Sequence, residues 1–423
     1  MIRERTVDRR RHLIPPVALI TLTLGVFAIN WLVRTDVSYL GSDEIFAQRE
    51  VRCGTPPDYS LFGENLSDPY RARFLFRFVL VGIHRLLGHS TITEMRVLFG
   101  ALCLLLSISI SLTLLVTSQR VFGLTPWGGF LAALLWVVSL THLNFFEYPC
   151  HGFEDLWCFE ILLLGLAALQ TQRRIPLHIL MVAGVLSRET MLTLPLIWVL
   201  HRPPGSGALH LRALGAIPYP LLCAVHRIIL GGGIEYDMDL ALQHNLHSPW
   251  AAVGFALATF GALWLLAPFA WWQVKGLRGT PLHGWVAAVA VLTIAITTAL
   301  GGRFIEHRVL FLAFPWMLIP AAAFLTEADW HAVRWGRFTR FAILMTLATG
   351  IHWTVALHRV QTDGIDLRTA LIRMSPGHAQ FVRVAWQAEM WRAAISLFIT
   401  APLALCLLVS GLRVRDGAGG RQS

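Results

Sequence analysis

The sequence has few charged residues: only 14% are Asp, Glu, Lys or Arg, against roughly 25% in an average soluble domain. Apolar residues make up 55% of its 423 residues, so polar side chains are too few to cover a water-soluble globule of this size. A disordered chain needs the opposite composition, with low hydrophobicity and high net charge. The composition therefore favours a helical membrane protein, whose apolar surface is covered by lipid.

Lysine is nearly absent, and the cysteines form no metal-binding motif. Of 35 basic residues only Lys275 is a lysine, and the formal net charge is +10. Arginine suits lipid headgroup phosphates, whereas no basic helix or aromatic RNA-binding motif is present, so we expect no nucleic-acid partner. The six cysteines show no CxxC spacing, which argues against a zinc site. We predict no cofactor; a divalent metal is compatible with the sequence but not required by it.

Apolar runs of about 20 residues, the length that crosses a bilayer, recur along the chain. The first follows five N-terminal arginines, and no small-residue cleavage site follows it, so we expect a retained span that starts in the cytoplasm. We predict an all-α polytopic bundle of about 10–12 spans within one transmembrane domain, 1–423. The predicted spans are 13–33, 95–118, 126–146, 156–170, 213–230, 250–271, 282–302, 309–325, 341–356 and 393–411.

Loop charge decides how 176–200 crosses the membrane. This stretch is apolar but interrupted by Ser187, Arg188 and Glu189. As a hairpin of two short helices it leaves the acidic loop 231–248 outside and the arginines of 334–340 inside, whereas a single helix would reverse both. We therefore favour the hairpin, with both termini cytoplasmic in a bacterial inner (cell) membrane.

Two sizeable extramembrane segments remain, 34–93 and 357–392, both predicted outside. The first holds an expected interface helix at 74–87; the second carries five arginines, which fit the outside poorly. Tryptophans expected at the membrane interfaces are Trp31, Trp127, Trp250, Trp271, Trp272 and Trp391.

Ionisable residues suited to catalysis fall at the outer ends of these spans. Asp43 and Glu44 open the first outer loop, where a carboxylate can act as general base on an acceptor hydroxyl or amine. Arginines of the same loop and of a later outer junction suit a phosphate group, although solvated loops or local ion pairs explain them as well. The arginines are Arg71, Arg73, Arg303 and Arg308. Glu306 stands three residues from Arg303 and can pair with it.

Two further clusters interrupt apolar sequence. Asp155 is either a site residue or a helix N-cap, and Glu154 is expected on the surface. Glu160 lies inside a predicted span, where a carboxylate needs a polar partner or a wet cavity. Arg188 and Glu189 are sequence neighbours, so they do not share a helix face. That predicts a broken helix with each charge reaching a different partner, in either a functional or a hairpin-fixing role.

These features resemble the GT-C superfamily of membrane glycosyltransferases, nearest to the lipid A aminoarabinose transferase and protein O-mannosyltransferase type. Asp43-Glu44 with Phe46-Ala47 is similar to the family's Asp-Glu motif and aromatic-Ala pair, although the aromatic comes one residue earlier and is Phe, not Tyr. Other stretches that resemble uncharacterised bacterial members are Asn144 to Asp155, Arg173-Arg174, Ser187-Arg188-Glu189-Thr190, and Glu306-His307-Arg308 followed by Pro315.

The resemblance implies a GT-C-like bundle with interface helices in the first extracytoplasmic loop and a polyprenyl-phosphate sugar donor. It implies Asp43, with Glu44, as the catalytic base. The substrate-binding residues that we predict around the donor are Arg71, Arg73, Asp155, Arg188, Glu189, Arg303, Glu306 and Arg308.

The predicted function is transfer of a sugar from polyprenyl phosphate to an envelope acceptor at the extracytoplasmic face. One alternative is a polysaccharide polymerase or ligase acting on undecaprenyl-linked glycans, because the outer arginines also suit a diphosphate. Another is a lipid or solute transporter, which would gather polar residues near the bilayer midplane, where only Glu160 and Arg188-Glu189 are candidates. A non-catalytic membrane subunit is a third alternative.

Overall fold

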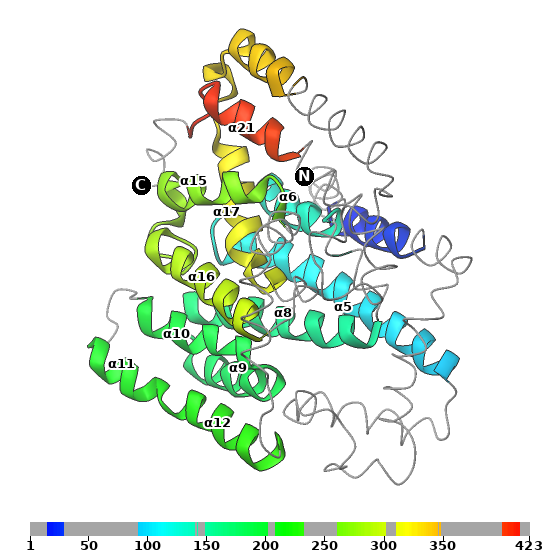
Figure 1. Ribbon diagram of the computed structural model, residues 1–423, viewed down its shortest axis with the longest axis vertical. Helices are drawn as coiled ribbons and strands as arrows, with labels where there is room; N and C mark the ends of the chain where they lie inside the picture. The colour runs from blue at the N-terminus through cyan, green and yellow to red at the C-terminus, as the bar shows by residue number, and fades with distance from the viewer. Residues whose placement is uncertain are drawn as a thin grey trace, which may run out of the picture. The chain divides into compact units, whose positions relative to one another are not determined.

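The computed structural model describes residues 15–28, 92–139, 142, 149–201, 208–231, 260–301, 310–345, 347 and 400–414. Over these residues the structure is helical, and its β contact is one isolated antiparallel bridge, Ala328 to Val414 (Figure 1). The all-α prediction is therefore confirmed for the part described. The chain divides into two compact units, Met1–Asp237 with Gly279–Ile294, and Met238–Arg278 with Ala295–Ser423.

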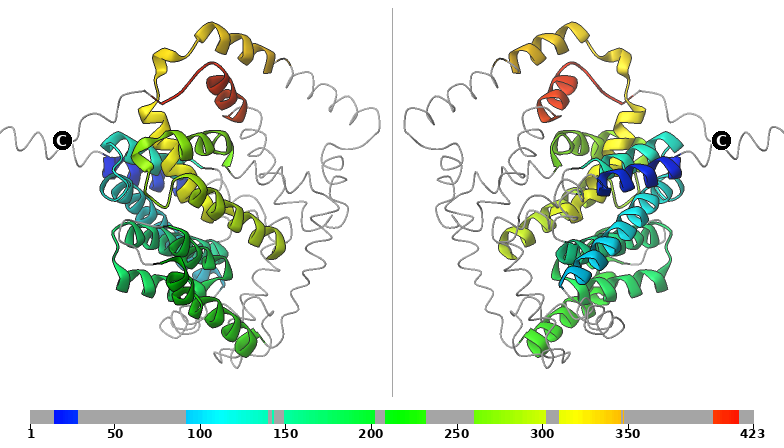
Figure 2. Two further views of the ribbon diagram at one scale, coloured as in Figure 1. Left: turned by 90° about the vertical axis from the view of Figure 1, so that its left-hand side faces the viewer. Right: turned by 90° about the vertical axis from the view of Figure 1, so that its right-hand side faces the viewer.

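Unit 1 holds the N-terminal helices. They are Pro15–Ala28, α5 (Ile92–Arg120), α6 (Pro126–Val137), α8 (Pro149–Gln170), α9 (Arg174–Ser187), the 3-10 turn η1 (Glu189–Leu192), α10 (Thr193–Leu200), α11 (Leu209–Ala216) and α12 (Pro218–Gly231). Helix α5 packs against α6 and α8, and α8 packs against α9. Helices α9 to α12 lie together in Figures 1 and 2.

The stretch 176–200 folds back on itself, as predicted. His178 in α9 and Trp198 in α10 have ring centroids 5.4 Å apart, whereas a straight helix would separate them by about 30 Å. Along α8, Asp155 contacts Arg188, and further on Gly165 contacts Leu194 of α10. Helix α10 therefore runs in the same direction as α8, α9 runs back, and Arg188 lies at the tip of a hairpin.

Three predicted boundaries are wrong, each for a local reason. The predicted span 213–230 is two helices, because Pro218 has no N–H to continue the helix before it. Helix α6 begins at Pro126, where the Thr125 hydroxyl accepts from the Gly128 N–H at 3.1 Å, but it ends at Val137, well short of 146. Helix α8 begins at Pro149, seven residues before the predicted start.

Unit 2 is built around α17 (Phe314–Glu327). Its other helices are α15 (Leu263–Gln273), η2 (Lys275–Leu277), η4 (Trp330–Ala332), a helix over 335–345 and α21 (Ala401–Val409). Helix α16 (Gly284–Gly301) begins among the residues of unit 1 and ends among those of unit 2. Every residue from Phe314 to Phe324 is buried, and α15 packs against α17 and α21.

Trp271, which we predicted at a membrane interface, lies near the end of α15 but is covered by protein. Its side chain is buried, and its indole N–H donates to the Trp316 carbonyl oxygen at 2.7 Å. A buried indole needs such an internal acceptor. Trp127 and Trp272 are exposed, as expected of interface residues; the other interface tryptophans lie outside the described residues.

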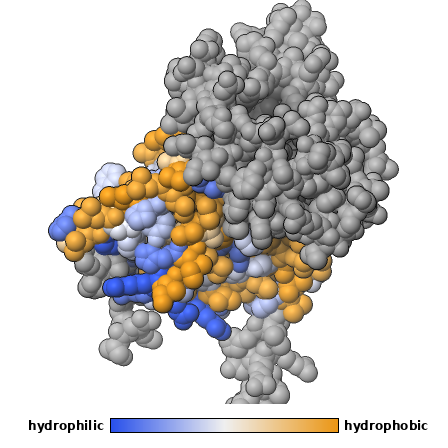
Figure 3. Space-filling view, turned by 90° about the horizontal axis from the view of Figure 1, so that it is seen from below, coloured by the Kyte–Doolittle hydropathy of each residue, from blue (hydrophilic) through white to orange (hydrophobic). Residues whose placement is uncertain are grey.

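Two described helices, Gly100–Arg120 and Leu310–Glu327, are long and apolar enough to cross a membrane. Several shorter helices expose apolar side chains along one face: on α9, Ile175 is 75% and Ile179 62% exposed. Figure 3 shows such apolar surface interleaved with hydrophilic residues on one face of the molecule. A bundle of about 10–12 spans within one domain stays a prediction.

Candidate functional site

A buried ion pair lies at the tip of the hairpin. Helix α9 ends at Ser187, and Arg188 has extended backbone angles (φ −159°, ψ 143°) before η1 begins. Because Arg188 leaves the helical path, its side chain reaches α8, where Nη1 donates to Oδ1 of Asp155. The predicted broken helix is confirmed, and Arg188 has the separate partner that was expected.

Both members of this pair are withdrawn from solvent. Each side chain is 2% exposed, and the flanking Ser187 and Thr190 are also buried. Taking two charges into an apolar interior costs several kcal/mol per ion, and only their mutual attraction and hydrogen bonding offset that cost. The arrangement therefore holds an arginine in a fixed orientation at the tip of the hairpin.

The positions of the α8 carboxylates correct two expectations. Since α8 begins at Pro149, Asp155 lies in its second turn and cannot be the N-cap. Glu154 is 1% exposed and so is not a surface residue. Both carboxylates belong to the interior of unit 1.

A second polar group lies further along α8. Glu160 Oε1 accepts from the Ser109 hydroxyl at 3.0 Å and from the Thr113 hydroxyl at 2.7 Å. Ser109 and Thr113 are four residues apart on α5, so both face α8. These hydroxyls supply the partners that a carboxylate within an apolar helix requires. Sequence analysis missed them, although the spacing of four in an apolar run was the available signal.

A third cluster closes the open end of the hairpin. His178 Nδ1 is hydrogen-bonded to the Tyr219 hydroxyl, and Arg212 donates from Nη1 to the His201 carbonyl oxygen. The Arg212 guanidinium also lies 5.6 Å from the ring centroid of Trp198. Burial lowers the pKa of His201 to about 4, and the positive charge of Arg212 adds to this effect. The cluster ties α11 and α12 to the hairpin and was not predicted.

Of the ten predicted site residues, the structure brings together Asp155 and Arg188. Glu189 lies in η1 and is partly buried. The remaining seven lie outside the described residues: Asp43, Glu44, Arg71, Arg73, Arg303, Glu306 and Arg308. Within the described part, no three His, Cys, Asp or Glu side chains gather in a way that could hold a metal ion.

Comparison of the chain with protein families, curated proteins and solved structures gives no match.

Proposed function

We propose that this chain is a multi-span membrane glycosyltransferase that uses a polyprenyl-phosphate sugar donor at the extracytoplasmic face of a bacterial inner membrane. The observation that carries the proposal is the buried pair of Arg188 and Asp155 at a helix break. The resemblance of the sequence motifs to GT-C enzymes supports the choice of reaction.

The membrane part of the proposal is supported by surface composition. Large apolar side chains are exposed at helical spacing on α9 (Ile175, Ile179), α12 (Leu221, Val225) and α16 (Leu292, Ile296). Exposed apolar faces of this kind are costly in water but stable against acyl chains. Lipid is therefore the environment that we assign to these faces, in agreement with the low charge content of the chain.

The hairpin supports a phosphate site. Its arms are short and its tip carries a guanidinium. In our proposal the tip therefore lies within or near the membrane rather than beyond it. Arginine presents five N–H donors in a planar fork that matches phosphate oxygens. In our proposal Asp155 orients this fork, and Arg188 binds the phosphate of the lipid carrier beside it. In a medium of low dielectric constant, such a preset positive charge stabilises a leaving phosphate strongly.

The reaction is written as a single inverting displacement. Asp43 takes the proton of the acceptor hydroxyl or amine while that oxygen or nitrogen bonds to the anomeric carbon of the sugar. The bond from the anomeric carbon to the phosphate oxygen breaks, and its electron pair leaves with the polyprenyl phosphate. Arg188 stabilises the charge that develops there.

Transfer of radiolabelled sugar from polyprenyl phosphate into membrane acceptors tests this proposal. We expect Asp43→Asn to reduce transfer by about 100-fold or more, because a general base contributes about 10²–10⁴ in rate. Arg188→Ala is expected to reduce transfer comparably, and Arg188→Lys to retain part of it. Arg120→Gln, an exposed arginine at the end of α5, is the matched control.

Full transfer by both Asp43→Asn and Arg188→Ala would reject the site. If the chain transfers glycans from a polyprenyl diphosphate but no sugar from the monophosphate, the polymerase or ligase alternative replaces our proposal.

Transport is a second candidate, favoured by Glu160. This carboxylate lies within an apolar helix and is bound by two hydroxyls, as expected of a residue that binds a proton or solute. Glu160→Gln would then abolish uptake into vesicles, whereas in a transferase it should leave sugar transfer largely intact.

A further inference from the structure

In unit 2, four arginines gather where the C-terminal segment joins the chain after α17. The antiparallel bridge pairs Ala328 with Val414, and the Asp329 N–H donates to the Arg413 carbonyl at 2.7 Å. The Arg334 N–H donates to the Ser410 carbonyl at 2.9 Å. These backbone contacts bring Arg413 beside the segment that carries Arg334, Arg337 and Arg340. We call these four residues the arginine rim.

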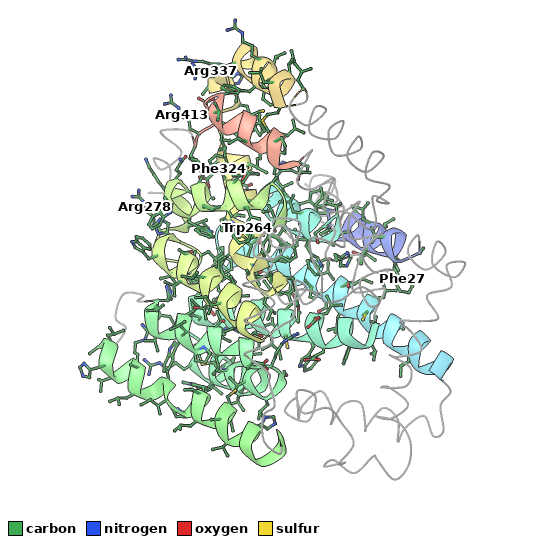
Figure 4. The ribbon with its side chains drawn as sticks, viewed as in Figure 1. Phe27, Trp264, Arg278, Phe324, Arg337 and Arg413 are labelled. Carbon is green, nitrogen blue, oxygen red and sulfur yellow. The ribbon has the colours of Figure 1, made fainter. Side chains whose placement is uncertain are left out.

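The arginine rim is exposed. All four side chains face solvent, and within the described residues none forms an ion pair. Arg334 immediately precedes the helix over 335–345, and the N–H groups of Arg337 and Phe338 donate to its carbonyl oxygen. Arg337 and Arg340 follow at spacings of three, so the three arginines lie along one side of the start of this helix. Arg337 and Arg413 project outward at the same end of unit 2 in Figure 4. Four exposed guanidinium groups close together favour a positive potential at this end.

The polarity of this helix changes along its length. Its first turns carry Arg337 and Arg340, and the residues that follow expose Ile343, Leu344 and Leu347. The indole of Trp335 is also exposed beside the arginines. A sequence of cations, an aromatic residue and apolar side chains matches the order of headgroup, interface and acyl chain in a bilayer.

We propose that the arginine rim binds the headgroup phosphates of anionic phospholipids. This inference rests on the membrane location in the proposed function but not on the transferase reaction. A soluble anion would not explain the apolar half of the same helix, whereas a lipid satisfies both halves, with its phosphate on the arginines and its chains on Ile343 and Leu344. Each basic residue near an anionic surface contributes about a fivefold preference.

The test uses the full chain, purified in neutral detergent. Native mass spectrometry counts bound dioleoylphosphatidylglycerol against dioleoylphosphatidylcholine for the wild type and for Arg334→Gln/Arg337→Gln/Arg340→Gln. We expect the wild type to prefer phosphatidylglycerol, and the triple variant to lose this preference by roughly 100-fold, as three charges at about fivefold each require. The matched control is Arg334→Lys/Arg337→Lys/Arg340→Lys, which keeps the charge and should keep most of the preference.

Equal binding of the two lipids by the wild type, or an unchanged preference in the Gln variant, would overturn the inference. Unfolding in the neutral lipid checks that all variants fold; if the Gln variant does not, Arg337→Gln alone is used, with an expected fivefold loss. Competition by inorganic phosphate at equal concentration would show that the rim recognises a free anion and would also overturn it. Sugar transfer is not a readout, so failure here and failure of the transferase proposal are separable.

Discussion

Breaking the ion pair between Asp155 and Arg188 should be far more harmful than removing it whole. Asp155→Asn leaves a buried guanidinium without its carboxylate, and Arg188→Met leaves a buried carboxylate without its guanidinium. Both side chains are 2% exposed, so water cannot replace the lost partner. Removing one member of a buried pair costs about 3–5 kcal/mol of unfolding free energy.

The double variant Asp155→Asn/Arg188→Met removes both charges together. Replacement of a whole buried pair by groups of similar volume is often neutral, so its loss should be about 1 kcal/mol or less. The coupling between the two substitutions is then about 5 kcal/mol or more, well above the 0.5–3 kcal/mol usual for neighbouring residues. The double variant should regain stability without regaining sugar transfer, since Arg188 would still be missing.

Denaturant titration in detergent, followed by the fluorescence of the 16 tryptophans, gives these free energies. Arg278→Met serves as the control, because Arg278 is exposed and should change stability by less than about 0.5 kcal/mol. Additive losses in the double variant would refute the reasoning, because they would mean that the two charges do not stabilise one another.

Two further predictions concern the hairpin. A Cβ at Gly165 would overlap the side chain of Leu194, so Gly165→Ala should lower the free energy of unfolding by about 1–3 kcal/mol in the same titration. Gly336 has open space around it, so the control Gly336→Ala should be neutral or stabilising. Equal effects of the two substitutions would contradict this packing. Burial lowers the pKa of His201 to about 4, below its unfolded value of about 6.5, so its contribution to stability is complete above pH 6.5 and is lost as the pH falls toward 4. Unfolding of His201→Gln between pH 4 and 7 should vary less with pH than that of the wild type, and parallel curves would count against this assignment.

The helix break could be predicted from sequence, but the partner of Arg188 could not. Adjacent charges inside an apolar run cannot share a helix face, which is a local argument and needs no tertiary structure. Asp155 lies 33 residues away, and its contact depends on how far α8 extends before the hairpin.

Hydropathy set the start of α8 too late because charged residues lower the local average, whereas backbone hydrogen bonds continue through them. Glu154 and Asp155 were therefore placed at the edge of a span, although they lie well inside α8. Ser109 and Thr113 escaped notice for the related reason that hydroxyls are nearly neutral on such scales. Their importance comes from the carboxylate opposite them on α8, which is a tertiary property.

Helix rises explain why an arginine meets Asp155. From Asp155 to Gly165, α8 rises about 15 Å at 1.5 Å per residue. From Arg188 to Leu194 the chain rises only about 11 Å, counting η1 at about 2 Å per residue and α10 at 1.5 Å. Gly165 and Leu194 are in contact and so lie at the same level along the helix axes. The backbone of Arg188 is therefore about 4 Å short of the level of Asp155, which is the difference between the two rises. A long side chain must close this gap. Arg188 closes it with a charged end, so the length of this residue matters as much as its charge.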